Sequence, residues 1–159
     1  MIAGPINIGA VKKDHRRFME ANRSMVMREM RKAGEVAVRV AKIGAGQVGV
    51  GLRVRTGKLR KATKYKVIQL AGGARVRVSN AVKYAPYLEF GTKAHVIEAK
   101  NAKALRFMFP QFSGKYIYRK RVMHPGNPAY KWLWTGVNDA WIFLRVRLLH
   151  DMKVLASQF

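Results

Sequence analysis

The hydrophobic positions in the first third of the chain follow the spacing of an amphipathic helix. Apolar residues recur three and four positions apart and form one stripe, which consists of Val26, Met30, Ala33, Ala37 and Val40. Asp14 is a candidate N-cap, so the pattern predicts a helix from there to about Ile43. Residues 1–10 lack such a period and contain two glycines and a proline, which predicts a flexible arm.

The middle of the chain changes from a helical period to alternation. Residues 44–55 are dense in glycine and predict a mobile loop, and a short helical turn is expected at residues 58–62. Two alternating runs then flank Gly72 and Gly73, which indicates a β-hairpin. The strands expected in this region are residues 65–69, 75–79, 95–99, 104–109 and 115–122.

The last helix is expected from about Ala129 to Ser157, after the turn sequence HPGNP. Its apolar stripe consists of Leu133, Val137, Ala140, Leu144, Leu148 and Met152. Trp134, Trp141 and Ile142 extend the apolar surface over more than half of the circumference. One core cannot cover all of that surface, so we expect a partner to contact it.

These elements predict a single α+β domain that covers residues 1–159. It would contain a long N-terminal helix, a small and mostly antiparallel sheet of four to five strands, and a long C-terminal helix packed on that sheet. No run of apolar residues is long enough to predict a membrane span, and the N-terminus lacks the pattern of a secretory signal.

The charge of the chain predicts a partner of opposite sign. Lysine and arginine number 32 against 8 acidic residues, which gives a net charge of +24. We expect contact with nucleic-acid phosphates and no readout of bases, because no recognition-helix or zinc-finger pattern occurs. The candidate DNA-facing residues are Arg53, Arg55, Lys58, Arg60, Lys61, Arg75 and Arg77.

Signatures of catalysis are nearly absent from the sequence. The chain has no cysteine, and none of its four histidines is spaced from an acid as a metal site or a catalytic triad requires. The glycines at 44–51 lack the order of a phosphate-binding loop. We therefore expect neither enzymatic activity nor a cofactor or metal.

The segment YAPYLEFGT, from Tyr84 to Thr92, predicts a rigid aromatic corner. Proline restricts its backbone, and one of the few carboxylates in the chain, Glu89, stands among large apolar residues. Phe90 is expected in the core, because large apolar side chains are most often buried. We interpret Glu89 as a structural anchor and expect its removal to harm folding or assembly.

Three segments of the chain form a combined pattern. They are VRTGKLRKA, VKYAPYLEFGT, and KALRF followed by HPGNPAYKWLW, and together they cover roughly residues 54–140. In this order they resemble the neck or tail-component proteins of long-tailed bacteriophages, which are described as head–tail joining or tail-completion proteins. The positions that match the motifs are Thr56, Gly57, Leu59, Tyr84, Ala85, Glu89, Phe90, Gly91, Thr92, His124, Pro125 and Gly126.

The resemblance implies a virion structural protein at the head–tail neck, synthesised in the host cytoplasm. It would form a ring of six or twelve copies around packaged double-stranded DNA, between head-completion or connector proteins and tail-terminator or tail-tube proteins. A basic nucleic-acid-binding protein, such as a ribosomal protein, is the alternative, and a phosphodiester-cleaving enzyme is a third reading. The high positive charge leaves open whether the basic face meets DNA or an acidic protein ring.

Overall fold

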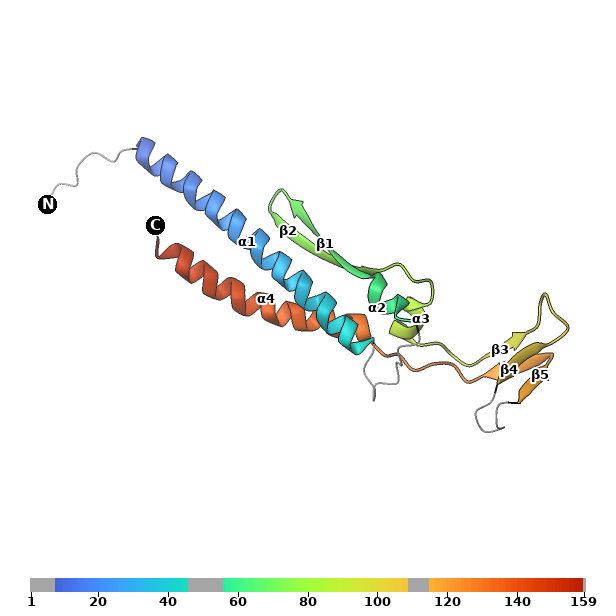
Figure 1. Cartoon of the computed structure of the whole chain (residues 1–159). Coiled ribbons are helices and arrows are strands. Elements are labelled where there is room, and N and C mark those ends of the chain that lie inside the picture. Colours follow the sequence, from blue (N-terminus) through green and yellow to red (C-terminus); the bar gives the residue numbers. More distant parts are fainter. Residues whose placement is uncertain (1–7, 46–55, 109–114, 159) are drawn as a thin grey trace. The chain divides into compact units, whose positions relative to one another are not determined.

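The computed structural model of the protein describes residues 8–45, 56–108 and 115–158 (Figure 1). Contacts divide the chain into two compact units. One consists of residues 1–83 and 132–159 and is called the helical unit below. The other consists of residues 84–131 and is called the ribbon unit. The predicted loop at 44–55 lies outside the described residues except for Gly44, which ends the first helix, and Ala45, which follows it in a turn.

Two long helices, α1 (Ile8–Gly44) and α4 (Trp132–Ala156), pack along each other in the helical unit (Figure 1). Small side chains allow a close approach, since Ala33, Ala37 and Ala140 form the core together with Leu144. The helices approach closely at Gly136, where a Cβ atom would collide with the backbone oxygen of Ala37. The seam between these helices therefore depends on the absence of a side chain at Gly136.

The predicted hairpin is confirmed. It follows the short helix α2 (Lys58–Ala62) and consists of β1 (Thr63–Leu70) and β2 (Gly73–Asn80), paired antiparallel. Its inner side chains pack on α1, where the ring of Tyr65 fills the space beside Gly34. Two hydrogen bonds to the carbonyl of Leu59, from Thr63 Oγ1 at 2.9 Å and Asn80 Nδ2 at 2.7 Å, fix the base of the hairpin.

The ribbon unit contains a short helix and two further strand pairs. The helix is α3 (Ala85–Phe90), and the strands are β3 (His95–Glu98), β4 (Leu105–Met108), β5 (Tyr116–Arg119) and β6 (Arg121–His124). β3 pairs with β6 and β4 pairs with β5, both antiparallel. The strand expected at 115–122 is thus two strands, which separate at Lys120 and have different partners.

The predicted α+β class with two long terminal helices is confirmed, and the described strands form three two-stranded ribbons. The first helix begins at Ile8, so Asp14 lies inside it and residues 8–10 of the expected arm are helical. Residues 1–7 of that arm lie outside the described part. The last helix begins at Trp132, after Lys131 with a φ of 49°. The single domain stays a prediction.

The buried stripes of both long helices agree in part with the predicted ones. On α1 the predicted Ala33 and Ala37 are buried, whereas Val26, Met30 and Val40 lie at the border of the buried face. The other buried residues of α1 are Met25, Glu29, Gly34 and Ala41. On α4 the predicted Ala140 and Leu144 are buried together with Trp132 and Gly136, and the predicted Val137 and Met152 are exposed. Where the two helices meet, small residues let the backbones approach.

Candidate functional site

The outer face of the hairpin carries a concentration of positive charge. Lys64, Lys66, Arg75 and Arg77 are all exposed, and the strand register places Lys66 directly opposite Arg77. Like charges in such a pair destabilise a hairpin. Helix α2 adds three exposed cations, and residues 58–80 contain no acid. The basic hairpin surface, defined as Lys58, Arg60, Lys61, Lys64, Lys66, Arg75 and Arg77, therefore fits a polyanion.

Five of the seven candidate DNA-facing residues are exposed cations of this surface, namely Lys58, Arg60, Lys61, Arg75 and Arg77, and their contact with DNA stays a prediction. Arg53 and Arg55 lie outside the described residues. Lys64 and Lys66 were missing from the prediction, although they alternate with Tyr65 and Val67 and so had to share a face. The alternation was therefore a sufficient signal to find them.

The first motif, TG-x-L, forms the turn that leads into α2 and the hairpin. Gly57 has a φ of 69°, which favours glycine, and Thr56 Oγ1 accepts a hydrogen bond of 3.4 Å from the Lys58 amide. Leu59 is buried. Since its carbonyl also receives the bonds from Thr63 and Asn80, this motif sets where the hairpin begins.

The second and third motifs meet in the ribbon unit through their backbones. Thr92 and Asn127 exchange two hydrogen bonds of 2.9 and 3.1 Å, and Thr92 Oγ1 also accepts from the Asn127 amide. Gly91 and Gly126 have φ values of 75° and 89°. A Cβ at Gly91 would lie 2.7 Å from the Asn127 oxygen, and one at Gly126 would collide with the Thr92 oxygen. We call this arrangement the glycine clasp, and it explains why both motifs need glycine.

Helix α3 buries Ala85 and Glu89 of the YAPYLEFGT segment and leaves Phe90 exposed. Ala85 and Glu89 are buried, as residues one turn apart on the same face should be. Phe90 points elsewhere and is 79% exposed, so its predicted place in the core is wrong. Tyr84 is exposed as well. The burial of Glu89 agrees with a structural position, and the Glu89 backbone oxygen accepts from the Lys131 amide at 3.2 Å.

Sequence reasoning missed the most deeply buried carboxylate, which is Glu29 on α1. Its side chain is fully buried and accepts from Lys32 Nζ at 2.7 Å, Arg28 Nε at 3.1 Å and Arg147 Nε at 3.4 Å. Burial raises the pKa of Glu29, but the hydrogen bonds from the three cations outweigh it and lower the pKa to about 2. Since Arg147 belongs to α4, this cluster joins the two long helices.

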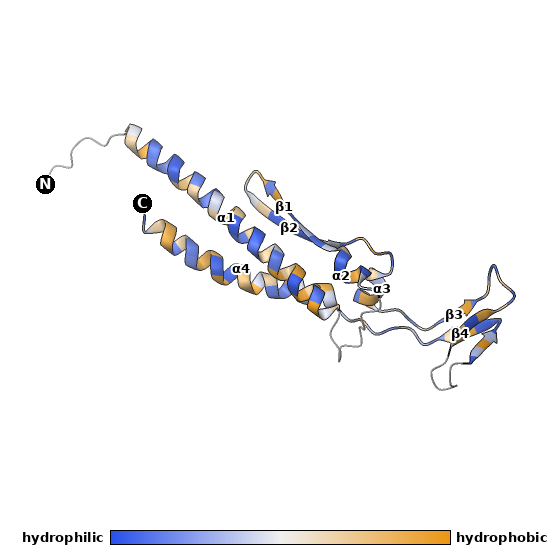
Figure 2. Cartoon of the chain, viewed as in Figure 1, coloured by the Kyte–Doolittle hydropathy of each residue, from blue (hydrophilic) through white to orange (hydrophobic). Residues whose placement is uncertain are grey.

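The exposed side of α4 carries the excess apolar surface that the sequence predicts. Its members are Trp134, Trp141, Ile142, Val146 and Leu149, each more than half exposed. Figure 2 shows hydrophobic residues along the whole length of this helix, whereas α1 is more mixed. A surface of this composition is typical of a protein contact.

His124, the first residue of the HPGNP turn, contacts a second histidine and the backbone of the same turn. His124 faces His95 across the β3–β6 pair with ring centroids 5.1 Å apart, and its Nδ1 accepts from the Gly126 amide at 3.0 Å. Pro125 connects His124 to the glycine clasp. Within the described ranges, no three histidine or acidic side chains converge as a metal site would need, and none of the described helices has the length and hydropathy to cross a membrane.

Comparison with known proteins agrees with the resemblance seen in the motifs. The model of the HK97-gp10-like family, described as "Bacteriophage HK97-gp10, putative tail-component", matches residues 10–91. The match spans just over half of the chain, from the first turn of α1 through the hairpin and the first motif to Gly91 in the second motif, and it ends before the third. No curated protein and no solved structure shows significant similarity to the chain. The chain belongs to the HK97-gp10-like family of phage tail components and is accordingly a structural protein of the virion.

Proposed function

We propose that the protein forms a ring around the DNA path at the head–tail neck, with the basic hairpin surface toward the DNA. Membership in a tail-component family supports a place in the virion. The observation that carries the proposal is the pairing of Lys66 with Arg77 on a surface without acids. Such repulsion is relieved when phosphates lie against it, so the surface suits a polyanion better than solvent.

The rest of the molecule supplies features that a ring needs. Neighbouring copies in a ring use heterologous contacts that close by rotation. The exposed apolar residues of α4 and the exposed Tyr87 and Phe90 of α3 are candidates for contacts with adjacent copies or with connector and tail-terminator proteins. We propose a non-enzymatic role, with assembly in the host cytoplasm and a final position in the neck.

The DNA contact is tested by measuring the affinity for a duplex of arbitrary sequence at several salt concentrations. Changing Lys66 and Arg77 together to Gln should lower the slope of log affinity against log salt by about 1.8, at about 0.9 for each phosphate contact. The control changes Arg31 and Lys153 to Gln, since both are exposed cations of the long helices. Equal slopes for the two double variants would refute the assignment of the surface.

Ring formation is tested by sizing and negative-stain imaging of the purified protein, together with its detection in purified virions. Rings of six or twelve copies and presence in the particle are the expected results. A chain that stays monomeric at high concentration and is missing from virions would contradict the proposal. Co-purification with ribosomal subunits in high salt would favour the nucleic-acid-binding alternative.

A further inference from the structure

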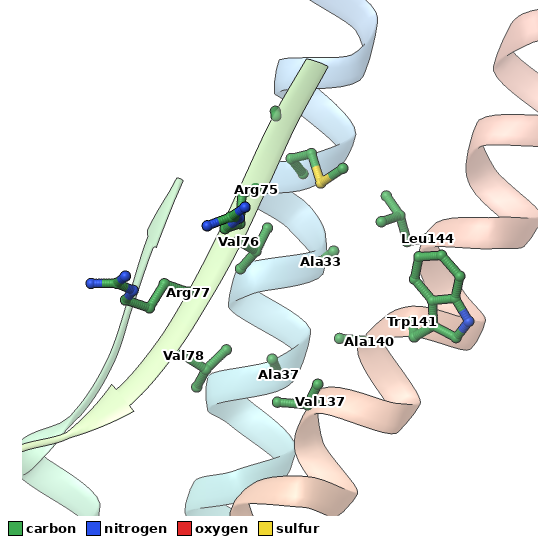
Figure 3. A pocket seen from close by; sticks show the side chains of 12 residues that line it. Ala33, Ala37, Arg75, Val76, Arg77, Val78, Val137, Ala140, Trp141 and Leu144 are labelled. Carbon is green, nitrogen blue, oxygen red and sulfur yellow. The ribbon is translucent and has the colours of Figure 1, made fainter. Parts of the chain in front are cut away.

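The helical unit contains a groove that is lined mainly by apolar side chains. It has a volume of about 540 Å³, within the range of ligand pockets, and lies between β2 and α4 over α1. Figure 3 shows Ala33 and Ala37 of α1 between Val76 and Val78 on one side and Val137, Ala140, Trp141 and Leu144 on the other. Ten of the twelve residues that line it are apolar, and the other two are Arg75 and Arg77.

Strand β2 meets this groove with its backbone edge. Five consecutive residues, from Ala74 to Val78, line the groove, although successive side chains of a strand point to opposite faces. A strand can contribute consecutive residues in this way only if the backbone itself faces the space. No residue of β1 lines the groove, and among the described strands β2 pairs only with β1. The edge toward the groove is thus the free one.

A free edge beside an apolar trough is the arrangement that accepts an added strand. Five residues of strand extend over about 17 Å, so β2 offers room for a strand of similar length. Alternate side chains of the incoming strand would enter the groove between β2 and α4. The others would lie on the outer face beside Arg75 and Arg77, whose positions alternate with Val76.

The outer face determines the charge of the incoming strand. Arg75 and Arg77 stand two residues apart, and Lys66 lies opposite Arg77 on β1. Acidic residues two apart on the added strand would pair with these cations, whereas lysine or arginine there would be repelled. No two of the eight acidic residues in this chain are two positions apart. A second copy therefore cannot supply the complementary pattern.

We infer that the groove binds an extended segment of a different protein, in which apolar residues alternate with acidic ones, as a third strand beside β2. This inference goes beyond the proposed ring, because it concerns a partner other than DNA or a second copy. The recognition would combine backbone hydrogen bonds along β2, apolar side chains against Trp141 and Leu144, and acids beside Arg75 and Arg77.

The test uses the full chain at physiological salt and a fluorescein-labelled octapeptide of alternating valine and glutamate. Two control peptides have alternating valine and lysine, and four valines followed by four glutamates. We expect the alternating glutamate peptide to bind at least tenfold more tightly than either control. We also expect it to slow hydrogen exchange of the amides from Ala74 to Val78.

Two pairs of variants separate the groove from general attraction to a basic protein. Trp141→Ala should weaken binding about tenfold, whereas Trp134→Ala should not, since Trp134 is a similarly exposed residue of the same helix outside the groove. Changing Arg75 and Arg77 to Glu should reverse the preference between the glutamate and lysine peptides. Changing Lys58 and Lys61 to Glu alters the net charge equally and should leave the preference intact.

Several results would overturn the inference. They are equal affinity for the alternating and block peptides, no detectable binding, or binding without protection of the β2 amides. A fourth is self-association of the chain that Trp141→Ala abolishes and Trp134→Ala does not, because the groove would then belong to a second copy. None of these results bears on DNA binding by the basic hairpin surface, which fails or succeeds by its salt slope.

Discussion

Replacing Glu29 by Gln should destabilise the protein strongly at neutral pH, because this one buried carboxylate accepts hydrogen bonds from three cations. The hydrogen bonds from Lys32, Arg28 and Arg147 lower the pKa of Glu29 from 4.5 to about 2. At 1.36 kcal/mol for each pKa unit, this difference corresponds to about 3 kcal/mol. The three cations remain partly in solvent, which screens the interaction, so we expect a loss of about 2 kcal/mol in the free energy of unfolding.

The stability difference between the protein and Glu29→Gln should depend on pH, whereas a loss of packing alone would not. A carboxylate whose pKa is lower in the folded state stabilises fully above its unfolded pKa, and this stabilisation is lost as the pH falls through the folded pKa. The difference between the natural protein and Glu29→Gln should therefore be present above about pH 5 and should shrink toward zero near pH 2.

The assay is denaturation by urea at several pH values, followed by tryptophan fluorescence. Trp132 is buried in the same helical unit and reports its unfolding. The matched control is Glu20→Gln, the same change at an exposed position of the same helix. Equal stability of the two variants at pH 7, or a difference that persists unchanged at pH 2, would refute the reasoning.

Three further substitutions test the packing. Gly126→Ala should lower the free energy of unfolding by about 1–3 kcal/mol, because Gly126 has a positive φ and a Cβ there would meet Thr92. It should also speed hydrogen exchange of the clasp amides. Gly73→Ala is the control, since Gly73 has open space around it, and it should change neither quantity by a comparable amount. Gly136→Val should lower stability by about 1–3 kcal/mol or more, seen as a lower urea midpoint, because it forces α1 and α4 apart. Phe90→Ser should change the free energy of unfolding by less than about 0.5 kcal/mol in the same assay, because Phe90 is exposed. A larger loss would indicate that the Phe90 side chain is buried.

The hairpin and the long helices were predictable because their signals are local. Alternation on both sides of Gly72 and Gly73 is enough to place β1 and β2. The helical period is equally local, but it does not reveal which face of a helix will be covered. For α1 the period correctly placed Ala33 and Ala37 on the buried face, but it also placed Val26, Met30 and Val40 there, where the structure buries Met25, Glu29 and Ala41.

The misses at Glu29 and Phe90 have different causes. Glu29 lies four residues before Ala33 on the buried stripe, but an acid in a very basic chain is ordinarily assigned to solvent. Its partners include Arg147, 118 positions away, which no local pattern reveals. Phe90 was judged by its residue type, whereas it is the last residue of a six-residue helix whose buried face carries Ala85 and Glu89.

The charges of the helical unit connect its stability to its proposed ligand. In the seam between α1 and α4, Glu29 compensates three cations, but the hairpin has no acid to compensate Lys66 and Arg77. A ligand that binds only the folded protein raises its stability in proportion to the logarithm of ligand concentration above the Kd. A polyanion that binds the folded basic hairpin surface more tightly than it binds the unfolded chain should therefore raise the melting temperature, and it should do so less when Lys66 and Arg77 are neutral. Simple salt screens the same repulsion but weakens the phosphate contacts, so the gain from the polyanion should fall as salt rises. General attraction of a polyanion to a protein with a charge of +24 falls with salt in the same way, so the comparison with the variant in which Lys66 and Arg77 are neutral is the one that identifies the local repulsion.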